Sequence, residues 1–183
     1  ENGTIYVGTG DGRGAHNQNG LSVLNYENSF VGTGIYAFDG TSLTQIESTA
    51  KFVNDLAVFG NRLYAATNEG LKYYENGTWE SIMEGEEAYG IEVSSDGNIV
   101  AVVGNNVFMS NEEGGLSNIT TGDENMLPAS ETYKMVAVAP SDHNYIYVVY
   151  LTASNGTGNI YFTSDKGKTW KTAYTASTLY DIF

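Results

Sequence analysis

Residues 53–82 read VNDLAVFGNRLYAATNEGLKYYENGTWESI, and this stretch contains four short runs rich in β-branched and aromatic residues. The four runs, here named strands A to D, are Val53–Phe59, Arg62–Thr67, Gly70–Tyr74 and Trp79–Ile82. Runs of this kind, separated by Gly and Asn, are typical of strands joined by tight hairpin turns. The stretch therefore predicts one four-stranded antiparallel unit.

The same unit recurs along the chain. Strand C starts at Gly34, Gly70, Asn106 and Asn159, with spacings of 36, 36 and 53 residues. The units cover about residues 4–48, 52–82, 88–119 and 133–174. Repeated four-stranded units of this length predict an all-β fold, a β-propeller in which each unit is one blade. Strands such as Ile99–Val103 are apolar on both faces, as expected for strands packed between two blades.

The first unit lacks a strand A, and residues 178–183 look like a strand A with no unit after it. Two arrangements remain open for this single domain of residues 1–183. Either 178–183 completes the first blade and closes a four-bladed ring, or the chain is a wedge of a larger propeller. We favour the wedge, because four is the lower limit of blade number. The chain starts with Glu1 rather than Met, so we also expect a mature or excised piece.

Composition excludes several classes of function. The 183 residues include 22 Asp+Glu against 8 Lys+Arg, a formal charge of −14, which disfavours a nucleic-acid partner. The chain has no Cys, so disulfides, thiolate zinc sites and thiol nucleophiles are excluded. No apolar run is long enough for membrane insertion. We expect no cofactor; the turns at Asp11 and Asp123 offer oxygen ligands suited to Ca²⁺ but lack the spacing of a calcium loop.

The turn between strands C and D of the fourth unit carries the most specific motif, Thr163-Ser-Asp-Lys-Gly-Lys-Thr-Trp170. We expect the Asp165 carboxylate to accept backbone N–H bonds, Gly167 to adopt a positive φ and the Trp170 ring to cover the hairpin. The string is similar to the S/T-x-D-x-G-x-T-W pattern of BNR/Asp-box propellers. Degenerate versions occupy the same turn at 38–41 and 74–79, whereas 110–115 keeps only the turn glycine.

The resemblance implies a propeller whose Asp-box, here Thr163, Asp165, Gly167, Thr169 and Trp170, is a structural turn away from any active centre. Asp-box propellers include sialidases, xyloglucan-cleaving glycosidases, sorting receptors such as sortilin and assembly factors. A sialidase site would need three arginines, and this chain has only Arg13 and Arg62. A glycoside hydrolase with paired carboxylates remains an alternative, with Asp11, Glu27 and Asp123 as candidates. A surface role is sufficient for His143.

In a propeller, the B–C and D–A connections lie on one face and the A–B and C–D turns on the other. The longest connection is the first B–C loop, Gly10–Thr33, and loops of that length in a compact domain are usually functional or disordered. An alternative is that Leu21, Val23 and Leu24 fold this loop back as a plug of the ring. The candidate ligand-binding residues, which mix hydrogen-bonding and aromatic groups, are Asp11, Arg13, His16, Asn17, Asn19, Tyr26 and Glu27.

Together these features predict a non-catalytic binding or scaffolding propeller at an extracellular, cell-surface or virion location. Its partner would be a neutral glycan or a protein surface, and further propeller blades could come from another chain or a missing segment. Two alternatives remain: a glycoside hydrolase fragment, and a structural subunit of a virion, filament or surface layer.

Overall fold

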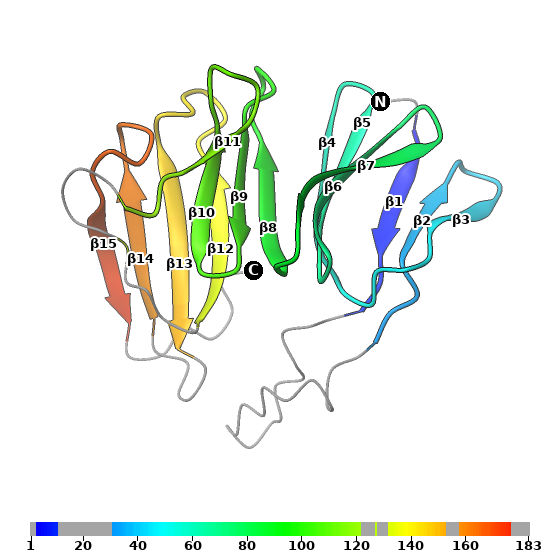
Figure 1. The fold of residues 1–183 in the computed structure, drawn as a ribbon, viewed down its shortest axis with the longest axis horizontal. Helices are drawn as coiled ribbons and strands as arrows, with labels where there is room; N and C mark the ends of the chain where they lie inside the picture. Colours follow the sequence, from blue (N-terminus) through cyan, green and yellow to red (C-terminus); the bar gives the residue numbers. More distant parts are fainter. Residues whose placement is uncertain (1–2, 11–30, 122–126, 128–131, 153–157, 177–183) are drawn as a thin grey trace.

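The computed structural model describes residues 3–10, 31–121, 127, 132–152 and 158–176. These residues form strands and turns without any helix, and the strands make four antiparallel sheets. Figure 1 shows the sheets side by side as the blades of an arc, in chain order, with no closed ring. The predicted all-β fold is therefore confirmed.

Blade 1 has three strands in the described residues, paired in the order β1-β2-β3: β1 (Ile5–Gly8), β2 (Ile35–Phe38) and β3 (Leu43–Glu47). They correspond to strands B, C and D, so β1 is an edge strand in this sheet. Blade 2 has all four strands in chain order: β4 (Val53–Phe59), β5 (Arg62–Thr67), β6 (Gly70–Glu75) and β7 (Thr78–Glu84).

Blade 3 consists of β8 (Ala88–Val93), β9 (Ile99–Val103), β10 (Asn106–Ser110) and β11 (Leu116–Asn118). Blade 4 consists of β12 (Thr132–Val138), β13 (Ile146–Thr152), β14 (Gly158–Thr163) and β15 (Lys171–Ala176). Residues 178–183 lie outside the described residues, so the closing strand stays a prediction.

The core lies between the blades rather than within any one sheet. Alternate side chains of strand B face the blade before and the blade after, because side chains alternate along a strand. In β9, Val100 and Val102 pack toward blade 4, whereas Ala101 and Val103 pack toward blade 2. All four are at most 1% exposed, which explains why this strand is apolar on both faces.

Two tryptophans connect neighbouring blades through hydrogen bonds at their outer strands. The Trp79 indole donates a 2.8 Å hydrogen bond from Nε1 to the carbonyl oxygen of Ile46 in blade 1. The Trp170 indole donates the same bond, also 2.8 Å, to the carbonyl oxygen of Ile119 at the end of blade 3. Trp170 is 2% exposed and packs in the cluster between blades 3 and 4. The Trp170 ring therefore stabilises the interface between blades 3 and 4 as well as its own hairpin.

The turn before Trp170 is held by its own side chains. The Asp165 carboxylate accepts hydrogen bonds from the Thr169 backbone N–H at 2.9 Å and from the hydroxyls of Thr163 and Thr169, both at 2.6 Å. Gly167 has a φ of +83°, and a Cβ there would lie 2.7 Å from the Cβ of Ile119. Glycine is thus required for both the backbone conformation and the close approach of blade 3.

Similar turns recur where the sequence motif is weaker. In blade 1, Asp39 Oδ1 accepts the N–H groups of Thr41 and Ser42 at 2.8 Å. In blade 3, Asn111 Oδ1 accepts the N–H groups of Glu113 and Gly115 at 3.1 and 2.9 Å. The third turn therefore keeps more than its glycine, because the Asn amide oxygen acts as the turn acceptor.

The Asp165 bonds predict a pH-dependent stability. Hydrogen bonds from the Thr163 and Thr169 hydroxyls lower the pKa of Asp165 to about 2. A lowered pKa means that the carboxylate stabilises the fold above its ordinary pKa, and that this contribution is lost as the pH falls through about 2. We expect Asp165→Ala to lower the free energy of unfolding by about 1–2 kcal/mol at neutral pH.

Urea unfolding of both proteins, from neutral pH down to about pH 2, measures this difference, which should shrink as the pH falls. Ser164→Ala, at an exposed position of the same turn, is the control and should leave the midpoint unchanged. A difference that stays constant down to the lowest pH would contradict the assignment.

Candidate functional site

The two ends of the long first B–C loop are joined at a common base between blades 1 and 2. The Thr9 backbone N–H and hydroxyl both donate to the carbonyl oxygen of Gly34, at 3.1 and 2.8 Å. The Thr9 hydroxyl in turn accepts the N–H of Thr33 at 2.8 Å. The Thr9 carbonyl accepts the N–H of Val53 in blade 2 at 3.1 Å. The base is therefore tied to both blades.

Close backbone packing at this base requires glycine. Gly10 has a φ of +87°, and a Cβ there would lie 2.1 Å from the carbonyl oxygen of Lys51. A Cβ on Gly32 would lie 2.3 Å from the carbonyl oxygen of Thr9. The Gly32 N–H donates a 2.7 Å bond to the Lys51 carbonyl, which joins the loop base to the D–A connection between blades 1 and 2. These contacts fix where the loop leaves the sheet.

The predicted ligand-binding residues themselves lie outside the described residues. This applies to Asp11, Arg13, His16, Asn17, Asn19, Tyr26 and Glu27, as well as to Asp123 and the proposed plug residues Leu21, Val23 and Leu24. The base at Thr9–Gly10 and Gly32–Gly34 is the part of this loop that the structure places.

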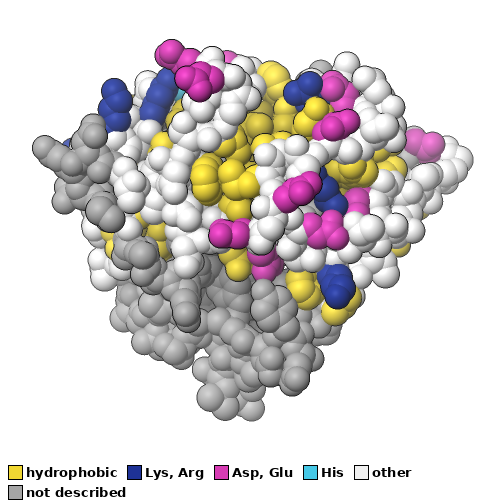
Figure 2. Space-filling model, viewed as in Figure 1, with side chains coloured by type: hydrophobic (Ala, Val, Ile, Leu, Met, Phe, Trp, Pro, Cys, Tyr) yellow, Lys and Arg dark blue, Asp and Glu magenta, His cyan; other side chains and the backbone are white. Residues whose placement is uncertain are grey.

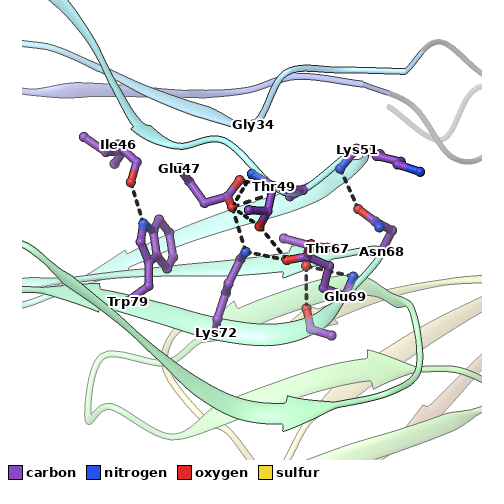
Figure 3. A network of polar contacts seen from close by, with 12 residues as sticks. Gly34, Ile46, Glu47, Thr49, Lys51, Thr67, Asn68, Glu69, Lys72 and Trp79 are labelled. Atoms are coloured by element: carbon purple, nitrogen blue, oxygen red, sulfur yellow. Dashed lines mark hydrogen bonds and ion pairs between the residues drawn. The ribbon is translucent and has the colours of Figure 1, made fainter.

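A polar network that the sequence analysis did not anticipate lies beside the loop base (Figure 3). Glu47 is buried at the end of β3, and its carboxylate accepts the N–H groups of Thr49 and Ala50 and the Thr49 hydroxyl. Lys72 of β6 places its Nζ 3.2 Å from Glu47 Oε1 and 3.0 Å from Glu69 Oε2. The Lys72 ammonium thus forms ion pairs with two carboxylates from different blades.

The charge state of Glu47 follows from these partners. Burial by itself would raise the pKa of Glu47, but hydrogen bonds from Thr49 and Ala50 and the Lys72 ammonium outweigh it and hold the pKa below its usual value. Glu47 is therefore ionised at neutral pH and acts as a structural anion.

Asn68 completes the junction. Its side-chain oxygen accepts the backbone N–H groups of Lys51 and Phe52, at 2.8 and 2.9 Å. Asn68 lies in the B–C turn of blade 2, and Lys51 and Phe52 lie in the D–A connection that precedes that blade. The B–C turn of blade 2 and the D–A connection before that blade are thus joined by hydrogen bonds on the B–C/D–A face.

A groove of about 520 Å³ runs along β6 and β7 from this junction. Its lining combines three acidic residues with a lysine, an aromatic ring and apolar surface: Glu69, Leu71, Lys72, Trp79, Glu80, Ser81, Glu84 and Gly85. The Lys72 ammonium lies 5.5 Å from the centre of the Trp79 ring. Figure 2 shows acidic side chains gathered around a basic one over the half of the visible face formed by blades 1 and 2. This surface offers hydrogen-bond acceptors and repels anions.

A second pair of carboxylates lies on the inner strands. Burial first, and the nearby Asp55 charge second, raise the pKa of Glu92 on β8. Asp55 on β4 accepts the N–H of Ile91 in the next blade at 3.0 Å, so this carboxylate joins two blades. Sequence spacing did not single out these residues, because they come together only when blades 2 and 3 pack.

The remaining titratable candidates have structural partners on the opposite, A–B/C–D face. His143 Nδ1 lies 3.1 Å from Asp96 Oδ2, which links the A–B turns of blades 4 and 3. Arg62 forms an ion pair with Glu75 at 3.1 Å and stacks over Tyr73. In the described part of the chain, no three His, Asp or Glu side chains come close enough to hold a metal ion. Nor does that part contain a helix capable of spanning a membrane.

Comparison with known proteins finds solved structures that resemble this chain. No protein-family model and no curated protein sequence matches the chain. The GH74 xyloglucanase from Xanthomonas campestris is 16% identical, with a TM-score of 0.56, over 76% of this chain and 27% of that one. YCF48, in a structure bound to D1 peptide, is 20% identical, with a TM-score of 0.51, over 79% of this chain and 48% of that one.

PorZ, a surface component of the type-IX secretion system of Porphyromonas gingivalis, is 14% identical, with a TM-score of 0.61, over 95% of this chain and 26% of that one. All three are β-propeller proteins. The described residues have the β-propeller fold. The chain spans less than half the length of each of these three propeller proteins.

The network beside the loop base predicts that Lys72 stabilises blades 1 and 2. In Lys72→Met the buried Glu47 carboxylate loses its cation, and we expect the free energy of unfolding to fall by about 2–3 kcal/mol at neutral pH. The deficit should shrink below the ordinary pKa of glutamate, because a protonated Glu47 no longer needs a cation. Urea unfolding at several pH values measures this effect.

Arg62→Met is the matched control, because it removes an exposed ion pair on the opposite face and should cost about 0.5 kcal/mol or less. Equal costs for the two substitutions would contradict the structural role of Lys72.

Proposed function

We propose that the chain is a non-catalytic binding or scaffolding propeller module whose ligand binds on the B–C/D–A face, at the junction of blades 1 and 2. The observation that supports this most is the base of the first B–C loop. Thr9 and Gly32–Gly34 are hydrogen-bonded to each other and to blade 2 or the D–A connection before it, and Gly10 packs against the Lys51 carbonyl, so the two ends of a long loop are fixed to the scaffold. Binding residues are disproportionately found on loops held in this way.

The composition of the loop supports a polar ligand. Between its two fixed ends the sequence carries Asp11, Arg13, His16, Asn17, Asn19, Tyr26 and Glu27. These side chains donate and accept hydrogen bonds and provide an aromatic face, which is the combination that binds sugars and polar protein surfaces. The adjoining groove adds Trp79, Glu80 and Glu84 on the same junction.

Charge narrows the class of ligand. With a net charge of −14 and acidic groups along the groove, the surface repels anions, so we propose a neutral glycan or a protein surface rather than sialic acid or nucleic acid. Among the structural neighbours, one is a xyloglucanase and another is bound to a peptide, and both classes of ligand are consistent with this proposal.

We also propose that Thr163, Asp165, Gly167, Thr169 and Trp170 form a structural Asp-box. The hydrogen bonds of the turn and the burial of Trp170 away from the loop base support a stabilising role. An extracellular or surface location is part of the proposal, and the surface component PorZ among the neighbours is consistent with it.

Replacing residues 11–29 with a Gly-Ser linker tests the proposed site. The replacement keeps Thr9, Gly10 and Gly32–Gly34, so we expect the melting temperature to stay close to that of the wild type. Binding to an array of neutral and sialylated glycans, and to a peptide array, should be measured for both proteins. We expect the wild type to bind neutral glycans or peptides and the replaced protein to lose that binding.

The control is an exchange of the turn residues 111–114 on the opposite face for a Gly-Ser turn, which should leave binding intact. Loss of the fold in the loop replacement would mean that the loop is a structural plug. Unchanged binding would place the site elsewhere on the propeller.

A further inference from the structure

In blades 2, 3 and 4 the apolar side chains that face the preceding blade are buried, whereas the equivalent side chains of blade 1 are exposed. In strand B of blades 2, 3 and 4, the side chains that face the preceding blade are aliphatic and at most 2% exposed: Leu63, Ala65, Ala101, Val103, Ile146 and Val148. The equivalent side chains of blade 1 are Ile5 and Val7, because Tyr6 and Gly8 face blade 2. Ile5 and Val7 are 58% and 44% exposed.

The residue at or next to the start of strand D departs in the same way. Trp79, Leu116 and Trp170 hold this position in blades 2, 3 and 4, and each packs against the preceding blade. In blade 1 the position is Leu43, which is 62% exposed. The register of β1, β2 and β3 puts these side chains on one surface, the blade 1 end face: Ile5, Val7, Tyr36, Phe38 and Leu43.

Blade 4 has the complementary surface at the other end of the arc. Ile146 and Val148 face blade 3, so Tyr147 and Val149 of β13 face away from it. The register of β13, β14 and β15 adds three more side chains to give the blade 4 end face: Tyr147, Val149, Ile160, Phe162 and Tyr174. Tyr147 stacks on Phe162 with ring centres 6.0 Å apart. Tyr147 and Tyr174 are 41% and 57% exposed, whereas Val149 is 9% exposed.

We propose that these two end faces bind each other between two copies of this chain, with blade 4 of one copy packed on blade 1 of the next. The contact would repeat the arrangement already present three times within the chain, where the face of one blade covers the opposite face of its neighbour. Exposed apolar faces of this kind mark interaction surfaces in soluble proteins.

A second copy is the partner that fits best, because one chain carries both halves of the interface. Within the chain these halves do not meet, since the described blades form an open arc (Figure 1). The contact is head to tail, and such contacts form closed rings when the rotation permits.

The mass of the chain in solution, measured by light scattering over a range of concentrations, tests the proposal. We expect a dimer. A charge placed in either end face should weaken association at least about tenfold, because an unpaired buried charge is costly. The variants are Val7→Glu and Leu43→Glu in the blade 1 end face and Tyr147→Glu in the blade 4 end face. These side chains are exposed in the single chain, so circular dichroism should show an unchanged fold.

Val58→Glu is the matched control, since Val58 of β4 is 50% exposed but lies outside both end faces. It should remain dimeric. A mixing experiment then tests the head-to-tail direction. Val7→Glu keeps an intact blade 4 end face and Tyr147→Glu keeps an intact blade 1 end face, so the two monomeric variants should form a 1:1 complex when mixed.

Three results would overturn the proposal. A wild-type chain that stays monomeric at every concentration would mean that these faces are covered by blades outside residues 1–183 or remain free. A dimer that survives Val7→Glu and Tyr147→Glu would place the interface elsewhere. Variants that fail to combine on mixing would exclude the head-to-tail contact.

Discussion

The fold depends on the contact between a residue at or next to the start of strand D and the blade before it. Strand D is the outer edge of each sheet, and an edge strand leaves backbone carbonyls without partners in its own sheet. The indoles of Trp79 and Trp170 satisfy one such carbonyl each and bury a large ring in the same step. A single four-stranded blade cannot bury both of its faces by itself. Packing of one blade on the next therefore creates the hydrophobic core.

The candidate site depends on the same interface. Trp79 packs on blade 1 in the cluster that also contains Ile35 and Leu63, and Lys72 lies beside its ring. The Lys72 ammonium forms ion pairs with Glu47 of blade 1 and Glu69 of blade 2. The Thr9 carbonyl at the loop base accepts the N–H of Val53 in blade 2. The position of the long loop relative to the groove is therefore set by how blades 1 and 2 pack.

Periodicity was enough to predict the sheets, because each blade is built from local hairpins. Tight turns such as Asn76-Gly77, with φ values of 52° and 87°, are encoded by adjacent residues and can be recognised from sequence. Contacts between blades could not be predicted in this way. Glu47 and Lys72 are 25 positions apart, and nothing in their local sequence indicates that they meet. Likewise, the hydrogen bond of Trp170 to Ile119 and the pairing of Asp96 with His143 arise from blade packing.

The two indole N–H groups provide the most direct measurement of blade packing. The chain contains two Trp residues, so a protein labelled with ¹⁵N-tryptophan and ¹³C-carbonyl isoleucine gives two indole signals. We expect both indole protons to exchange slowly with solvent and to show a through-hydrogen-bond coupling, one to the Ile46 carbonyl and one to the Ile119 carbonyl. Rapid exchange of either indole proton, with no coupling to an isoleucine carbonyl, would mean that the blades do not pack through these hydrogen bonds.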